Sequence, residues 1–247
     1  MKMRQKRTTN NCPYILLTAI CFIVLGCSEK SPSDDFYKSE NLYFPLNVGS
    51  RWDLSPKSTY TWDGKTTDVK HIYRVDSIVS ISGHLYAQMS HFVSLNGRII
   101  DSCANFFRYG DDGEILTTVD FKGIDPQQRS DFRDYPSSGI STWYNTNAEI
   151  DESWNAFGPD IGCVELAKYR ISLESRSDTV ITQDQMYIGC LRFFINKIGA
   201  SDTDYYVWLA RGVGLVKFHN PSGVVSPCLL TNFHISADGN PTERKFK

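Results

Sequence analysis

Alternating apolar and polar residues, interrupted by short turn dipeptides, are the main pattern of this chain. Residues 69–81 are rich in Val, Ile and Tyr, and residues 84–94 alternate apolar with polar side chains. The dipeptide Ser82-Gly83 between them is typical of a two-residue hairpin turn. The pattern therefore predicts a β-hairpin.

The same hairpin signal recurs twice in the first half of the chain. Asn-Gly at 96–97 precedes an extended run at 98–109, and Asp-Gly at 112–113 separates that run from residues 114–121. Four consecutive strands joined by short turns form a meander. Such a sheet buries one face in the core and exposes the other to solvent.

The second half of the chain resumes the extended pattern. Gly212 and Gly214 frame a tight bend there, because glycine admits positive φ. The extended runs cover residues 164–175, 179–196, 204–210, 215–219 and 227–235. The sequence thus predicts a mainly β fold, a single antiparallel meander domain with a curved sheet that forms a half-barrel or an open barrel.

The segment from 122 to 162 loses this periodicity, and we expect it to be one long loop or short-helix insertion. A short helix over 125–132 is compatible with Asp125 as N-cap and Pro126 at the first helical position. Four aromatic residues of the segment are expected to pack against the sheet rather than to bind a ligand: Trp143, Tyr144, Trp154 and Phe157.

The N-terminus has the pattern of an export signal. Four basic residues and no acidic one precede an apolar run at 14–25 that only Thr18 interrupts. This run is shorter than the roughly 20 apolar residues that a membrane-spanning helix needs, so a cleaved signal is favoured over an uncleaved anchor helix. It ends in Val-Leu-Gly-Cys at 24–27, which resembles the bacterial lipobox, and the resemblance implies a diacylglycerol on the Cys27 thiol and cleavage before it.

These features divide the chain into four parts: a lipoprotein signal peptide at 1–26, a flexible polar tether at 27–40, a β-rich globular domain at 41–236 and a polar tail at 237–247. An ordinary secretory signal with an incidental cysteine is the alternative. The expected location is the cell envelope, as a membrane-anchored lipoprotein of the outer membrane that faces the periplasm or the surface.

The charge of the mature chain disfavours several partners. Removal of residues 1–26 takes away four of the 26 Lys and Arg residues but none of the 28 Asp and Glu residues, which leaves a net charge of −6. Nucleic acid is therefore not expected as a partner, because phosphate binding needs a basic patch. The membrane is expected to be reached through the N-terminal lipid, since no polybasic segment is present.

Four cysteines remain in the globular domain, and an exported chain matures where disulfides form. If Arg176-Ser177 is a two-residue turn, residues whose numbers add up to 353 pair across the hairpin, which places Cys163 opposite Cys190. A disulfide between these two cysteines is therefore predicted, and a bridge between Cys103 and Cys228 follows by exclusion. No cysteine pair has the close spacing of zinc ligands, so no metal site is expected.

The usual catalytic motifs are absent from the sequence: it has no phosphate-binding glycine loop, no G-x-S-x-G elbow and no H-E-x-x-H helix. No cofactor is expected. Paired carboxylates at 34–35, 111–112 and 151–152 point apart on one strand or turn, which disfavours a two-acid hydrolytic site. Five histidines are expected to lie singly as structural residues on or beside strands: His71, His84, His91, His219 and His234.

Two segments resemble a known group of proteins. Residues 43–52, YFPLNVGSRW, resemble the opening YFPLxVGxxW segment of uncharacterised bacterial envelope lipoproteins, and residues 210–217, ARGVGLVK, resemble their closing GVGLVK segment. The resemblance implies a β-rich lipoprotein with a curved sheet. It indicates no active-site residues for this chain. From its size and apolar character, Trp52 is expected to be buried and to fill space where the chain enters the core.

Together these observations favour a non-catalytic binding or structural module of the envelope over an enzyme. Its expected partner is another envelope protein, a glycan or an apolar ligand. The alternative is an envelope hydrolase with a dispersed acid or serine site. A concave pocket with convergent acids would favour the hydrolase, whereas an apolar groove would favour ligand binding.

Overall fold

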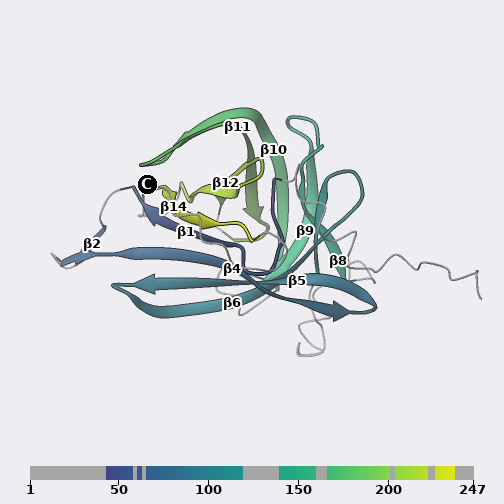
Figure 1. Ribbon diagram of the computed structural model, residues 1–247. Coiled ribbons are helices and arrows are strands. Elements are labelled where there is room, and N and C mark those ends of the chain that lie inside the picture. Colours follow the sequence, from purple (N-terminus) through teal and green to yellow (C-terminus); the bar gives the residue numbers. More distant parts are fainter. Residues whose placement is uncertain are drawn as a thin grey trace, which may run out of the picture. The chain divides into compact units, whose positions relative to one another are not determined.

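In the computed structural model, the described part of the chain consists of β-strands, turns and short connections (Figure 1). It covers residues 43–57, 60–62, 65–118, 139–159, 166–200, 204–221 and 226–236. The predicted signal peptide, lipidation at Cys27, tether, polar tail and short helix at 125–132 all concern residues outside these ranges.

The strands follow one another along the chain with short connections. Their bounds are β1 (Arg51–Pro56), β2 (Tyr60–Trp62), β3 (Lys65–Thr67), β4 (Val69–Ile81), β5 (His84–Leu95), β6 (Arg98–Tyr109), β7 (Glu114–Thr118), β8 (Ile140–Asn145), β9 (Ser153–Pro159), β10 (Leu166–Ile181), β11 (Met186–Lys197), β12 (Tyr205–Ala210), β13 (Gly214–His219) and β14 (Cys228–His234).

Twelve of these strands form one antiparallel sheet in the order β8-β7-β6-β5-β4-β1-β14-β13-β12-β11-β10-β9, and β2 pairs with β3 in a separate hairpin. Two meanders thus flank β1, which lies between β4 and β14. The sheet curls until it is nearly closed, which confirms the mainly β, curved-sheet prediction.

A seam between the edge strands β8 and β9 nearly completes the barrel. The Phe157 N–H donates to Ser141 Oγ at 3.0 Å, and the Trp154 indole N–H donates to the Thr142 carbonyl at 3.0 Å. A Cβ on Gly158 would lie only 2.6 Å from the Trp143 ring. Glycine at 158 therefore lets this indole approach β9 closely.

The three predicted two-residue turns are confirmed, because both residues of each turn have the positive φ that type I′ hairpins require. The six φ angles are 51° for Ser82, 81° for Gly83, 49° for Asn96, 79° for Gly97, 50° for Asp112 and 80° for Gly113. The local sequence therefore determines the registers at these hairpins.

The predicted turn at Arg176-Ser177 is wrong. Strand β10 continues through both residues to Ile181, and the chain reverses after it, where the Thr182 N–H donates to the Gln185 carbonyl at 2.9 Å. Neither Arg176 nor Ser177 has the positive φ of a type I′ turn. The β10–β11 hairpin is therefore longer than expected, and its register differs.

Both predicted disulfides are wrong as a consequence. In the observed register Cys190 faces Asp178, and Cys190 and Cys228 are buried free thiols. Burial raises the pKa of each thiol to about 11, so both are protonated at neutral pH. Cys103 is disulfide-bonded, and Cys163 lies outside the described residues.

The prediction of one long insertion from 122 to 162 is also wrong in part, since β8 and β9 lie inside it. Both strands are short, and neither shows the regular alternation of apolar and polar residues that marks a longer strand in the sequence. The expected packing of the aromatic residues of this segment is confirmed, because Trp143, Tyr144 and Phe157 are buried and Trp154 packs partly buried against the core. Trp143 and Tyr144 also line a cavity, so their role is not packing alone.

Trp52 is fully buried at the start of β1, as the sequence predicts. Its indole N–H donates to the Val213 carbonyl at 2.5 Å, and its ring stacks on Phe44 with centroids 6.1 Å apart. A Cβ on Gly214 would lie 2.9 Å from Trp52 Nε1 and 3.1 Å from Pro45 Cδ. The two segments that carry the family resemblance are thus in direct contact.

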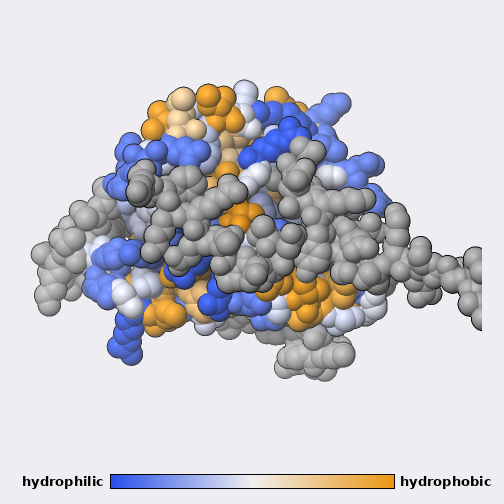
Figure 2. All heavy atoms as spheres, in the orientation of Figure 1, coloured by the Kyte–Doolittle hydropathy of each residue, from blue (hydrophilic) through white to orange (hydrophobic). Residues whose placement is uncertain are grey.

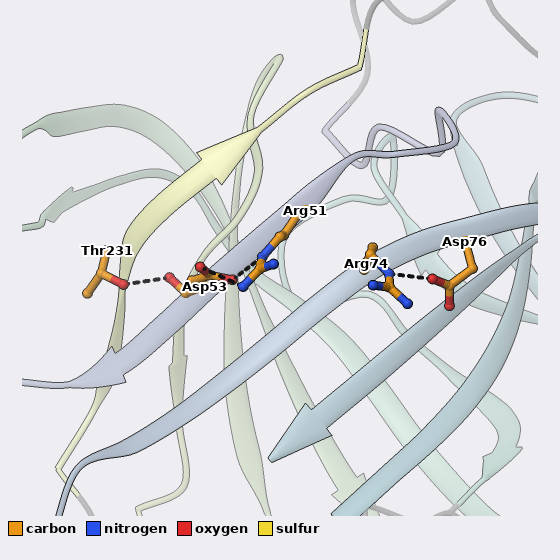
Figure 3. A network of polar contacts seen from close by, with 5 residues as sticks. All are labelled: Arg51, Asp53, Arg74, Asp76 and Thr231. Carbon is orange, nitrogen blue, oxygen red and sulfur yellow. Dashed lines mark hydrogen bonds and ion pairs between the residues drawn. The ribbon is translucent and has the colours of Figure 1, made fainter. Parts of the chain in front are cut away.

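The outer face of β1 and β4 carries charged pairs, which suit a face in contact with water (Figure 3). Arg51 contacts Asp53 at 2.7 Å, and Arg74 contacts Asp76 in the same way one strand further on. Arg51 and Arg74 are cross-strand neighbours. Each aspartate therefore offsets the repulsion between two adjacent guanidinium groups.

The molecular surface mixes hydrophilic with hydrophobic residues on the face shown in Figure 2. Large exposed apolar side chains gather near the end of the β10–β11 hairpin, namely Ile181, Met186 and Ile188. These positions flank the turn at 182–185 and pack against no part of the core.

Candidate functional site

A cavity of about 120 Å³ lies on the inner face of the curved sheet. Most of its lining is aromatic or aliphatic, with a few uncharged polar groups and no lysine, arginine, aspartate or glutamate among the described lining residues. The lining residues are Phe44, Trp52, His71, Tyr73, Met89, His91, Cys103, Asn105, Phe107, Thr117, Trp143, Tyr144, Tyr205, Val207, Leu215 and Phe218.

The alternation of the strands positions these side chains. In β5, Met89 and His91 point inward, and in the neighbouring β6 they face Asn105 and Cys103, respectively. Tyr73 of β4 lies opposite His91 on its other side. A period of two residues therefore brings side chains from three adjacent strands to one wall of the cavity.

Aromatic rings form a further part of the lining around Phe44, which precedes β1. The Phe44 ring meets Phe107 and Tyr144 at edge-to-face angles, each with centroids 5.5 Å apart. The Tyr144 ring in turn packs against the Phe193 ring, with centroids 5.0 Å apart. Edge-to-face contact is a preferred geometry of aromatic rings, so these rings stabilise one another in the lining.

Two histidines form the main polar group of the cavity. His71 Nδ1 and His91 Nε2 are 3.1 Å apart and hydrogen-bonded, and the His91 ring stacks on Tyr73 with centroids 4.3 Å apart. Burial lowers the pKa of His91 to about 3, with a smaller contribution from His71, and burial also lowers the pKa of His71. Both imidazoles are therefore neutral at pH 7.

A pair of neutral imidazoles leaves one donor and one acceptor free. One ring donates its only N–H to the other, so the donor ring keeps an acceptor nitrogen and the acceptor ring keeps an N–H. These groups lie at His71 Nε2 and His91 Nδ1, for which no hydrogen bond to a described residue is seen. Exchange of tautomers swaps the two roles.

Asn105 adds a third polar group beside the histidine pair. It faces Met89 across the ladder, one diagonal step from His91 on the same face. Its Oδ1 atom is buried and accepts no hydrogen bond from any described residue. An unsatisfied buried acceptor is costly, so this atom is suited to accept a hydrogen bond from a bound molecule.

Comparisons with known proteins identify no family. No protein-family model matches the chain, and no curated protein matches it. Two solved structures are similar to it in fold. One is a protein from Bacteroides fragilis described as exported and as having a YmcC-like fold, with 15% identity, a TM-score of 0.44 and coverage of 78% of this chain and 99% of that chain.

The second similar structure is described as a lipoprotein from Parabacteroides distasonis. It has 13% identity and a TM-score of 0.41, and the match covers 78% of this chain and 98% of that chain. Neither similarity assigns a function to the cavity.

The expectation that the histidines lie singly is wrong for one pair. His71 and His91 are in direct contact, whereas His84, on the same strand as His91, is exposed. A bulge at Asp76, between Val75 and Ser77, shifts the β4–β5 register by one residue. This shift brings His71 and His91 onto the same face of the sheet.

The paired carboxylates that lie within the described residues have structural roles. Asp112 occupies a hairpin turn, and Glu152 Oε2 accepts the Glu149 N–H at 2.8 Å. No group of three or more potential metal ligands occurs among the residues that the structure describes. Within the same residues, no helix has the length and apolar character needed to cross a bilayer.

Proposed function

We propose that this protein is a lipid-anchored lipoprotein of the cell envelope and that its curved sheet binds a small apolar ligand. The observation that carries the proposal is the aromatic cavity inside the sheet. Ligand sites are typically concave and mostly apolar, with a few polar groups that fix orientation. The described lining contains no Asp, Glu or Ser, which supports binding over acid-catalysed or serine-dependent hydrolysis.

The size of the cavity limits the ligand. An engineered apolar cavity of about 150 Å³ binds benzene and stays dry when it is empty. A volume of about 120 Å³ is somewhat smaller and therefore suits a single six-membered ring with at most one small substituent. Apolar burial drives such binding, and the rigid aromatic lining reduces its entropic cost.

The proposed location depends on the N-terminal sequence. A basic start, a short apolar run and Gly26-Cys27 support export, cleavage and acylation of Cys27. The mature chain would then reach the outer membrane through its lipid and face the periplasm or the surface. Its net charge of −6 argues against nucleic acid as a partner.

Substitution of Cys27 by alanine is expected to move the protein from the membrane fraction to the soluble fraction, because the only proposed lipid anchor is lost. Fractionation of cells followed by immunoblotting measures this shift. Cys21→Ala, which lies inside the proposed signal, is the matched control and should leave the protein at the membrane. Retention of the Cys27 variant in membranes would disprove lipid anchoring.

Toluene is expected to bind the mature protein, and Val207→Phe is expected to weaken this binding at least tenfold because the larger side chain fills part of the cavity. Val207 lines the cavity and is buried. Calorimetric titration of purified protein measures both affinities. Ile188→Phe, at a position that is 73% exposed, adds similar bulk elsewhere and should bind toluene like the wild type.

Two results would count against ligand binding in the cavity. Absence of toluene binding to the wild type would show that the cavity does not accept a ring of this size. Equal affinity in the wild type and Val207→Phe would place the bound toluene elsewhere on the protein. Thermal unfolding of each variant verifies that it is folded before the titration.

A further inference from the structure

We propose that His71, His91 and Asn105 make the cavity selective for a small aromatic molecule with one uncharged hydroxyl group, the class to which phenol belongs. This inference rests on the proposed function, since it requires that the cavity bind a ring. It names the chemistry of the ligand. It also assigns recognition to three residues from three adjacent strands, β4, β5 and β6.

The arrangement of polar groups supports a hydroxyl. A hydroxyl group donates one hydrogen bond and accepts others. The histidine pair offers one free donor and one free acceptor, and Asn105 Oδ1 is a further acceptor that no described residue satisfies. A hydroxyl placed beside these groups can therefore both donate and accept, whichever tautomers the histidines adopt.

The absence of charge in the described lining argues against an ionised ligand. A buried carboxylate or ammonium needs a partner of opposite charge, because its desolvation is costly. The described lining has none, and burial keeps both imidazoles neutral by lowering their pKa values. Besides the pair, the titratable side chains of the described lining are Tyr73 and Tyr144, whose burial raises their pKa values, Tyr205, and the disulfide-bonded Cys103.

The aromatic lining argues for a ring rather than a chain. Phe44, Phe107 and Tyr144 already meet at edge-to-face angles, which is the geometry that a further ring would extend. The volume of about 120 Å³ admits a single ring with at most one small substituent. Phenol fulfils each of these requirements.

Phenol and toluene form a matched pair of probes, because they have the same shape and differ in a hydroxyl or a methyl group. A purely apolar cavity prefers toluene, since the buried hydroxyl would lose its hydrogen bonds to water. A site built to bind a hydroxyl rejects the analogue that lacks it. We expect calorimetric titration of the mature wild-type protein at pH 7 to show about tenfold tighter binding of phenol.

Variants assign this preference to the proposed residues. Asn105→Leu removes an acceptor that no described residue satisfies, so the variant is expected to fold and to lose most of the preference for phenol. The double variant His71→Leu and His91→Leu is expected to prefer toluene. His84→Leu, on the same strand as His91 but exposed, is the control and should keep the preference.

A measurement on the wild type avoids dependence on folded variants. The ¹⁵N resonances of the two imidazoles report their tautomers, and they are expected to shift with phenol but not with toluene. Tighter binding of toluene than of phenol would overturn this inference and leave the proposed function standing. Failure of both probes to bind would overturn the proposed function together with the inference.

Discussion

Replacement of Trp52 by alanine is expected to lower the free energy of unfolding by about 3 to 5 kcal/mol. Trp52 is fully buried, donates its indole N–H to the Val213 carbonyl and packs beside Gly214. Its removal leaves a large void at the point where β1 and the start of β13 meet. Urea unfolding of the mature protein, followed by circular dichroism, measures the change.

Two further variants separate the effect of lost packing from that of the lost hydrogen bond. Trp52→Phe keeps much of the apolar volume but loses the hydrogen bond, so its expected loss is smaller, about 1 to 3 kcal/mol. Ile188→Ala removes an apolar side chain that is 73% exposed, and its effect should stay within about 0.5 kcal/mol. A similar stability of Trp52→Ala and Ile188→Ala would contradict the packing described for this tryptophan.

Acidification below pH 6.5 is expected to destabilise the protein by about 1.4 kcal/mol per pH unit through His91 alone. In the unfolded chain this imidazole has a pKa near 6.5, whereas burial lowers its pKa to about 3 in the folded protein. Between these values the unfolded state binds the additional proton. The contribution of His91 to the free energy of unfolding is therefore fully present above pH 6.5, and it is lost as the pH falls toward 3.

His91→Gln removes this proton linkage, so the unfolding free energy should depend less steeply on pH between 6.5 and 4.5. Comparison of urea unfolding at several pH values within this range measures the slope. His84→Gln is the matched control on the same strand, and it should keep the wild-type slope because His84 is exposed. Identical slopes in both variants would show that His91 is not buried in its neutral form.

The strands joined by tight turns could be predicted closely from the sequence. Strands β4 and β6 have the predicted bounds, because the Ser-Gly and Asn-Gly dipeptides adopt positive φ and set the chain reversal locally. The β10–β11 hairpin could not be predicted in the same way. Its turn at 182–185 has no such dipeptide, and the incorrect turn led directly to the incorrect pairing of Cys190.

The candidate site could be predicted only in part. The burial of Trp52 and of most of the aromatic residues in the 122–162 segment followed from their size and apolar character. The histidine pair did not, because its alignment depends on the bulge at Asp76. Without that bulge, the register set by Ser82-Gly83 places His71 opposite Ser94, and His91 then lies on the other face.

The seam between β8 and β9 has a consequence for the behaviour of many copies held close together. Free strand edges invite pairing with another chain, which leads to aggregation. Here each edge strand faces the other, and Ser141 Oγ and the Thr142 carbonyl accept N–H groups from β9. Intermolecular strand addition along this line is thereby disfavoured, so copies crowded on one surface can remain separate molecules.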